Sequence, residues 1–443
     1  MSQDRVALKL SLMGLAGASI EWYDFLLYGT AAALVFPTLF FPATMPPFVA
    51  LMASFSTFAV GFIARPFGGV LFGHLGDRVG RKRALVAALI LMGLATTMVS
   101  FLPSYRTAGV FSPLALLVLR LAQGLAIGGQ WGGATLLATE SAPKSRRGLY
   151  GSIAQAGVFM GVLLANVAVL LASALTTPQF FMSYGWRFPF LFSVILIGLG
   201  LFVHFRVEET AAFLQLQKPA RETPETKHSR SPLLDALRTS PGRILLGAGV
   251  LLPLHAVFYV VVTYAVAYGT SPSGLQLPRT TMLGGILIAQ LVAAPVSVLA
   301  GALSDRIGRR RVIMSGIAMM GLCGLVFFPL IETRASVWIV VALTMATSCN
   351  AVAYGPLGTM FAELFVTRMR YSAMSLSYQL GAIIGGGFVP IVATALYARF
   401  HTNLWIGLYI LLTSVVSLIC LHSLQETASV ELNAPLAAAT RPR

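Results

Sequence analysis

Two acidic residues inside an apolar stretch are the first feature of this sequence that could do chemistry. Glu21 and Asp24 lie in the segment 17–30, GASIEWYDFLLYGT, which is otherwise suited to cross a bilayer. Three positions apart, the two carboxylates share one face of a helix. A charged side chain at bilayer depth costs at least about 2.5–3.5 kcal/mol. The pair is therefore either a proton or substrate site facing a water-filled cavity, or a structural cap or interhelical hydrogen bond.

The composition indicates a polytopic membrane protein. The 443 residues are 57% hydrophobic and 10% charged, and the mean hydropathy is +0.80, whereas soluble proteins contain about 25% charged residues. The cysteines, Cys323, Cys349 and Cys420, lie in apolar segments without disulfide or metal-ligand spacing, which predicts packing roles. The sequence has no metal cluster, nucleophile–base set or nucleotide motif. We therefore expect no enzyme activity, no cofactor and no metal.

Apolar runs long enough to span a bilayer predict twelve transmembrane helices. They cover residues 10–36, 48–72, 84–102, 113–138, 149–174, 187–205, 243–268, 281–303, 311–330, 336–361, 371–396 and 403–422. Most of the 31 basic residues fall on the side of the membrane that holds both termini, and the positive-inside rule makes that side cytoplasmic. The net charge of +16 is thus explained by the basic residues of the cytoplasmic segments, and no nucleic-acid partner is expected.

The two halves of the chain repeat each other. GHLGDRVGRKR at 73–83 returns as GALSDRIGRRR at 301–311, and Glu140, followed seven residues later by an arginine, returns as Glu363. Parallel six-helix repeats are a transporter architecture. We predict an all-α membrane protein with an N-terminal six-helix half at 1–205, a cytoplasmic linker at 206–242, a C-terminal six-helix half at 243–422 and a cytoplasmic tail at 423–443.

The repeated loops place acidic side chains beside clustered basic residues at helix ends. Carboxylates and cations in such positions can hold one helix against another in a single conformation. The loops therefore predict a gate rather than a binding site. The expected gating residues are Asp77, Arg78, Arg81, Glu140, Arg147, Asp305, Arg306, Arg309, Glu363 and Arg370.

Over essentially its whole length, the sequence resembles the major facilitator superfamily and, within it, the metabolite:proton symporters. The resemblance is carried by motifs that include EWYDFLLYG (21–29), LRLAQGLAIGGQWGGA (119–134) and YSAMSLSYQLGAIIGGG (371–387). Their arrangement is similar to the shikimate-type branch. One departure is Gln130, where the family usually has Glu. The resemblance implies the major facilitator fold in a cell inner membrane.

Arg120 is the cation expected to act with the carboxylates. It begins the fourth predicted span and is followed by Gly124, Gly128 and Gly129, which let a neighbouring helix approach closely. The resemblance implies that the first and fourth spans line one cavity, with Asp24 and Arg120 facing each other. A substrate carboxylate would compete with Asp24 for the guanidinium and so couple protonation to substrate binding. The alternative is a permanent structural ion pair.

Other polar side chains in the spans are candidates for substrate contact. Gln155 and Gln379 lie at matching depths in the two halves, and the resemblance implies that their spans face the cavity. His255, one turn before Tyr259, is either a titrating group or a buried neutral one. Arg65 is expected to be structural, and it could either reach the cytoplasmic surface or pair with Glu21. The predicted substrate contacts are Arg120, Gln155, Tyr259, Tyr378 and Gln379, and the predicted proton-coupling residues are Asp24, Glu21 and Arg120.

These features together predict a monomeric proton-coupled symporter in the lipid bilayer that imports a small polar organic acid, such as shikimate or a related mono- or dicarboxylate. The alternatives are a zwitterion or compatible-solute:proton symporter and a proton-coupled exporter. Exporters of the superfamily carry a Gly-Pro-rich motif in the fifth span, whereas residues 156–166 contain no proline. Osmosensing relatives have a C-terminal coiled coil, for which residues 423–443 have neither the length nor the heptads.

Overall fold

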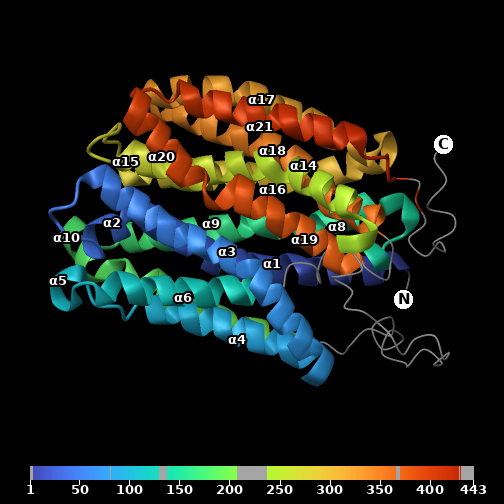
Figure 1. Cartoon of the computed structure of the whole chain (residues 1–443), viewed down its shortest axis with the longest axis horizontal. Coiled ribbons are helices and arrows are strands. Elements are labelled where there is room, and N and C mark those ends of the chain that lie inside the picture. Colours follow the sequence, from blue (N-terminus) through green and yellow to red (C-terminus); the bar gives the residue numbers. More distant parts are fainter. Residues whose placement is uncertain are drawn as a thin grey trace.

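The computed structural model describes residues 3–79, 81–128, 136, 138–206, 237–365, 370–428 and 430. Every regular element in these ranges is a helix, and the long helices run roughly parallel to one another in a single bundle (Figure 1). The start of α1 (Gln3–Leu34) and the end of α21 (Leu404–Ser423) lie at the same end of the bundle. We call this the termini end, and the other the opposite end.

The long helices of the first half of the chain match the first six predicted spans. They are α1, α3 (Pro47–Val79), α4 (Arg81–Val99), α6 (Phe111–Gly128), α8 (Arg147–Gln155) continued by α9 (Gly157–Ala174), and α11 (Arg187–Arg206). Three short helices lie at the opposite end, namely α2 (Phe36–Leu39), α5 (Tyr105–Ala108) and α10 (Pro178–Phe180).

The second half follows the same plan. Its helices are α14 (Pro241–Tyr259) continued by α15 (Ala265–Thr270), α16 (Arg279–Ile307), α17 (Arg309–Glu332), α18 (Ser336–Leu364), α19 (Arg370–Ala382) continued by α20 (Val389–Phe400), and α21. Among the described residues, nine helical segments are long and apolar enough to cross a membrane, and α1, α4 and α11 run beside them. Helices are the expected spanning element because each one satisfies its own backbone groups in lipid.

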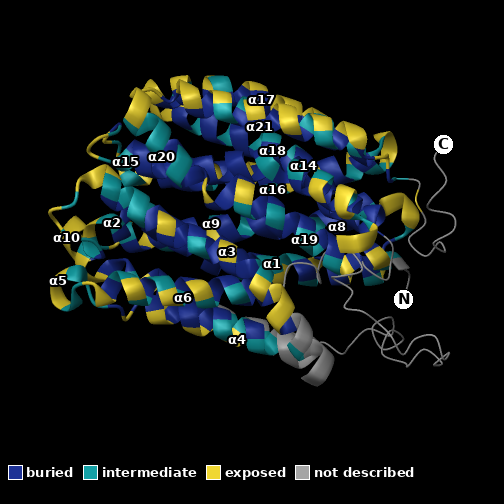
Figure 2. Ribbon diagram, viewed as in Figure 1, coloured by how far each residue is buried: buried dark blue, intermediate teal, exposed yellow. Residues whose placement is uncertain are grey.

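The outer surface of the bundle is apolar. Exposed residues follow the outward faces of helices such as α17 and α21 (Figure 2), and they include Leu322, which is 67% exposed, and Ile419, which is 62% exposed. Large exposed apolar areas are rare on soluble monomers, so this surface is suited to lipid chains.

Helices α3 and α6 touch backbone to backbone. A Cβ atom added to Gly124 would lie 2.2 Å from the Gly61 carbonyl oxygen, and one added to Gly128 would lie 1.9 Å from the carbonyl oxygen of Arg65. Only glycine permits this approach, so the close packing predicted from Gly124 and Gly128 is confirmed. Gly129 lies outside the described residues. The contact brings Arg65 on α3 and Arg120 on α6 to the same region of the bundle.

Two π-helical turns interrupt the central helices of the second half. One covers Val260–Tyr264, between α14 and α15, and the other covers Ile383–Gly387, between α19 and α20. A π-helical turn inserts one extra residue, which changes the face that the following helix presents. A Cβ at Gly386 would lie 2.8 Å from the Tyr259 ring, and one at Gly387 would lie 3.1 Å from Phe62. The second turn therefore packs the two halves together beside α3.

Candidate functional site

Two buried guanidinium groups share one aromatic ring in the middle of the bundle. The Cζ atom of Arg65 lies 4.2 Å, and that of Arg120 lies 3.9 Å, from the ring centroid of Phe25 on α1. Arg65 is 1% exposed and Arg120 is fully buried. A cation over a desolvated aromatic face gains about 2 kcal/mol. That gain is smaller than the cost of removing two cations from water.

The polar partners of the two arginines are incomplete. Arg120 Nη1 donates to Gln123 Oε1 at 2.9 Å, and Gln123 Nε2 donates to the Thr96 hydroxyl at 2.9 Å. Arg120 Nε and Nη2, and Arg65 Nε, have no hydrogen-bond partner among the described residues. No ion pair joins either guanidinium to a carboxylate within the described ranges. The site thus holds positive charge and N–H donors that an anion could use.

The expected pairing of Asp24 with Arg120 is not found. Arg120 lies over the rings of Phe25, Tyr28 and Phe58, at 3.9, 4.3 and 4.6 Å. Asp24, 1% exposed, lies instead beside the hydroxyl of Ser193 on α11, and its Oδ1 atom has no hydrogen-bond partner. Adjacent helical residues point about 100° apart, so α1 turns Phe25 toward Arg120 and Asp24 toward α11.

Glu21 faces the arginines more directly. It lines a small cavity together with Arg65, Phe25 and Tyr378. Arg65 was expected to be structural, with Glu21 as one of its expected partners, and the structure places both side chains at the same small cavity. The sequence signal was present, because an arginine deep inside a span is costly unless it faces a cavity or a partner.

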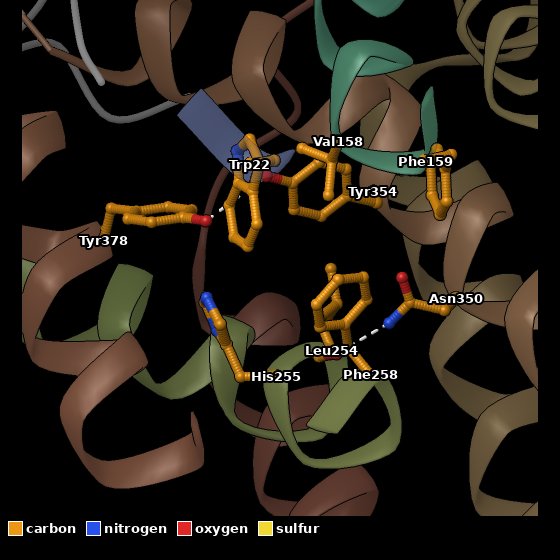
Figure 3. A pocket seen from close by; sticks show the side chains of 9 residues that line it. All are labelled: Trp22, Val158, Phe159, Leu254, His255, Phe258, Asn350, Tyr354 and Tyr378. Carbon is orange, nitrogen blue, oxygen red and sulfur yellow. Dashed lines mark hydrogen bonds between the residues drawn. The ribbon is translucent and has the colours of Figure 1, made fainter. Parts of the chain in front are cut away.

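A second cavity adjoins the first through Tyr378, which lines both. Figure 3 shows its side chains: Trp22 of α1 stands opposite His255 and Phe258 of α14, and Asn350 and Tyr354 of α18 close one side. The hydroxyl groups of Tyr354 and Tyr378 lie 3.2 Å apart. The volume is about 10 Å³, which holds about one water molecule. The central site is therefore closed to larger molecules in this conformation.

The remaining predicted contact residues are buried around this region. Tyr259 packs edge-on against Phe58 and Phe62, and its hydroxyl lies close to Arg65. Gln155 is 3% exposed and Gln379 is 4% exposed, but neither lines the two cavities described above. Of the predicted substrate contacts, Tyr378 is thus the one that lines both.

At the termini end, Asp305 of α16 caps a helix of the other half. Its Oδ1 accepts the backbone N–H of Gly148, and its Oδ2 accepts that of Leu149, each at 2.9 Å. These N–H groups belong to the first turn of α8, where a carboxylate is favourable. Arg309 Nη1 lies 2.6 Å from Asp305 Oδ1 and Arg309 Nε lies 3.4 Å from Glu363 Oε2.

A second contact at this end also crosses between the halves. Arg370 Nη1 lies 2.7 Å from Glu140 Oε1, and Arg147 Nη1 donates to the Val430 carbonyl at 3.1 Å. The repeat had grouped Glu140 with Arg147 and Glu363 with Arg370 along the chain. The structure instead pairs Glu140 with Arg370.

Not every predicted gating residue takes part. Arg306 is exposed and makes none of the ion pairs found in the described ranges. The structure does not describe the side chains of three other predicted gating residues, Asp77, Arg78 and Arg81. Gln130 also lies outside the described residues.

A helix bundle with an apolar outer surface, a small central cavity lined by ionisable groups and polar contacts between its halves at one end has the architecture of a membrane transporter. The model of the Major Facilitator Superfamily matches residues 25–386 and 286–439. The chain belongs to that superfamily, among its metabolite transporters, and is a multi-pass inner-membrane protein. The resemblance found in the sequence is confirmed.

Several individual proteins similar to this chain are transporters of small metabolites. The chain is 40% identical to the shikimate transporter of Escherichia coli K12 (93% of each chain covered). It is 38% identical to the inner membrane metabolite transport protein YhjE of the same organism (95% of this chain, 94% of the relative), and 32% identical to a proline/betaine transporter of Salmonella typhimurium (96% and 84%). The fold is similar to that of the xylose transporter XylE of E. coli in a partially occluded inward-open conformation, with a TM-score of 0.75 and 18% identity over 97% of this chain and 100% of XylE. These relatives are transporters, not enzymes, so the chain is a secondary transporter.

Proposed function

We propose that this protein is a proton-coupled symporter that imports a small polar organic acid, shikimate or a related mono- or dicarboxylate, and acts as a monomer. The observation that carries the proposal is the pair of buried guanidinium groups on Phe25, neither of which makes an ion pair with a carboxylate of the described residues, although Glu21 lines the same cavity as Arg65. A buried cation without a counter-ion is costly. A substrate carboxylate would supply the missing charge and accept the unused N–H groups.

Arg65 and Arg120 are the substrate-binding cations in this proposal. A guanidinium binds a carboxylate through two parallel N–H groups, which fixes orientation as well as charge. Tyr378, which lines both cavities, and Tyr259, whose hydroxyl lies close to Arg65, complete the polar surroundings of the two arginines. Gln155 and Gln379 would join it when the cavity widens.

Asp24 carries the transported proton. Its carboxyl group is buried and has no ion-pair partner among the described residues, so gaining or losing a proton changes the charge of the site directly. Glu21, in the same cavity as Arg65, links the substrate cations to α1. Substrate binding to Arg65 would alter the surroundings of Glu21 and, through the same helix, those of Asp24.

The termini end is cytoplasmic in this proposal, as the positive-inside rule requires. The halves 1–205 and 243–422 would then move relative to each other around the central site, joined by the linker 206–242. Asp305 on the first turn of α8, and the pair of Glu140 with Arg370, hold the cytoplasmic end closed. Separation of these contacts opens the cavity to the cytoplasm.

The test is uptake by proteoliposomes of labelled organic acids and zwitterions, with and without an imposed pH gradient. We expect accumulation of a carboxylate that is driven by an inward proton gradient and lost in Arg120→Ala. Accumulation independent of the gradient would contradict proton coupling. Export driven by the gradient would show a proton-coupled exporter instead.

A zwitterion or compatible-solute symporter is the second candidate. It is supported by the aromatic side chains of Trp22, Phe258, Tyr354 and Tyr378 around the second cavity, since aromatic faces bind quaternary ammonium groups. The similarity to a proline/betaine transporter of Salmonella typhimurium is also consistent with this candidate. Uptake of glycine betaine in preference to every organic acid in the panel would favour this candidate.

A further inference from the structure

His255 presents a hydrogen-bond acceptor to the second cavity. Its Nδ1 atom lies 3.1 Å from the Leu251 carbonyl oxygen, which can only accept, so Nδ1 carries the hydrogen. In the uncharged ring, Nε2 then holds a lone pair and accepts. His255 is 3% exposed and Nε2 has no partner. Figure 3 shows the ring reaching into the space between Trp22 and Tyr378.

Asn350 presents a second acceptor from the other side. Its Nδ2 atom donates to the Leu254 carbonyl at 2.6 Å, and this bond fixes the orientation of the amide. The oxygen Oδ1 lies on the other side of the amide and is turned toward Phe159, which also lines the cavity (Figure 3). Two acceptors from α14 and α18 thus face the same small space, and an unpaired acceptor that stays buried costs about 1–3 kcal/mol.

The two adjoining cavities offer different hydrogen-bonding groups. The cavity at Arg65 offers positive charge and N–H donors beside the Glu21 carboxylate, whereas the cavity at His255 and Asn350 offers the imidazole nitrogen and the amide oxygen beside the hydroxyl groups of Tyr354 and Tyr378. Tyr378 lies at the junction of the two. A ligand that occupied both would carry a carboxylate at one end and hydrogen-bond donors at the other.

We propose that His255 and Asn350 are specificity-determining residues that select organic acids bearing hydroxyl groups remote from the carboxylate. This inference rests on the proposed function, because Arg65 and Arg120 must first bind the carboxylate. The ring faces of Trp22 and Phe258 cover the space between the two polar ends, which suits a compact carbon ring with hydroxyl groups on its far edge. A quaternary ammonium group has no N–H and would leave both acceptors unpaired.

The experiment compares two acids of similar shape, shikimate and cyclohex-1-ene-1-carboxylate, which lacks the hydroxyl groups. Their dissociation constants are measured with the purified full-length protein for the wild type, His255→Phe, Asn350→Leu and the conservative variant His255→Gln. We expect the wild type to bind shikimate roughly tenfold more tightly or better, because the analogue leaves the acceptors unpaired. His255→Phe should reduce this ratio at least several-fold, mainly by weakening shikimate, and His255→Gln should restore part of it.

Gln290→Leu is the matched control. Gln290 on α16 is fully buried with both polar atoms unpartnered, yet it does not line either cavity. Its substitution should leave the ratio unchanged. If His255→Phe and Asn350→Leu weaken both acids equally while Arg120→Ala still weakens the binding of both acids strongly, the selectivity role is overturned and the carboxylate site stands. If the wild type binds neither acid but binds glycine betaine, both the inference and the proposed function are overturned.

Discussion

Asp305 and Gly148 lie 157 positions apart in the sequence, and the carboxylate of Asp305 accepts the Gly148 backbone N–H at 2.9 Å. Gly148 is also where a side chain would not fit, since an added Cβ would lie 2.4 Å from the Gly301 carbonyl oxygen. One half of the protein therefore caps a helix of the other at close range. This contact gives the gating hypothesis a specific geometry that can be tested.

Replacing Asp305 by Asn should favour the state that is open at the termini end. The amide keeps one acceptor but loses the charge that the α8 N-terminus and Arg309 stabilise, which is expected to shift the equilibrium by about 1–3 kcal/mol. On a background lacking Cys323, Cys349 and Cys420, Ser152→Cys at the α8–α16 contact should become more reactive to thiol reagents, and Thr38→Cys, at an exposed position of α2 at the opposite end, should become less so.

Arg306→Gln is the control for this prediction, because Arg306 is exposed beside Asp305. It should leave both labelling rates unchanged. Unaltered labelling in Asp305→Asn would remove the gating role from Asp305.

Glu140 and Arg370 should show strong energetic coupling. Their charged atoms lie 2.7 Å apart, with the Arg370 side chain only 4% exposed. A double-mutant cycle of Glu140→Gln and Arg370→Gln, read from the Ser152→Cys labelling equilibrium, should give an interaction energy of about 0.5–3 kcal/mol. The control pair is Asp4 with Arg146, at 3.7 Å and about half exposed, whose coupling should fall within about 0–1 kcal/mol. Equal coupling in the two pairs would argue against a cross-half gate.

Asp24→Asn should uncouple transport from the proton gradient. The amide imitates the protonated acid, so substrate can still bind and exchange, but no proton can be carried. Gradient-driven accumulation should fall to the background level, while counterflow exchange stays measurable. Full pH-driven accumulation by Asp24→Asn would exclude Asp24 as the proton carrier.

Arg120→Lys should weaken substrate binding nearly as much as Arg120→Ala. The ammonium group of lysine cannot form two parallel N–H contacts with a carboxylate and cannot spread over the Phe25 ring as the planar guanidinium does. We expect a loss of roughly 10- to 100-fold in affinity for each variant, the range of a charge-assisted hydrogen bond. Arg399→Lys, which changes an exposed arginine 5.8 Å from the Phe400 ring, should bind normally. Near-native affinity in Arg120→Lys would rule out the bidentate contact.

Gly128→Ala should destabilise the protein through the α3–α6 contact. The new methyl group would lie 1.9 Å from the Arg65 carbonyl oxygen, and backbone cannot move aside as a side chain can. Overpacking of this kind costs about 1–3 kcal/mol, which should lower the thermal midpoint in detergent. Gly284→Ala, at a position with open space around it, should not lower the midpoint. Equal midpoints would mean that α3 and α6 can separate without penalty.

The sequence by itself determined the membrane class, the helical segments and the repeated halves. Whether a segment can span the bilayer depends on the hydropathy of about 20 consecutive residues, because the thickness of the bilayer fixes the length of a spanning helix. This property can be read from the sequence of each segment alone. Each of the twelve predicted spans therefore overlaps a helical segment of the structure. The close approach of a neighbouring helix at Gly124 could also be predicted from the sequence, since small residues at that spacing in a span usually mark a helix–helix contact.

Only the tertiary structure decided which ionisable groups meet. The sequence grouped Glu140 with Arg147, yet Arg370 is its partner. The expected pair of Asp24 with Arg120 is absent because α1 turns Phe25 toward the arginine. Arg65, expected to be structural, shares that ring. Each of these relationships depends on how one helix is rotated against another, and that rotation is set by packing among residues far apart in the chain. Hydropathy places a side chain within a span, but only the packed bundle determines which partner it faces.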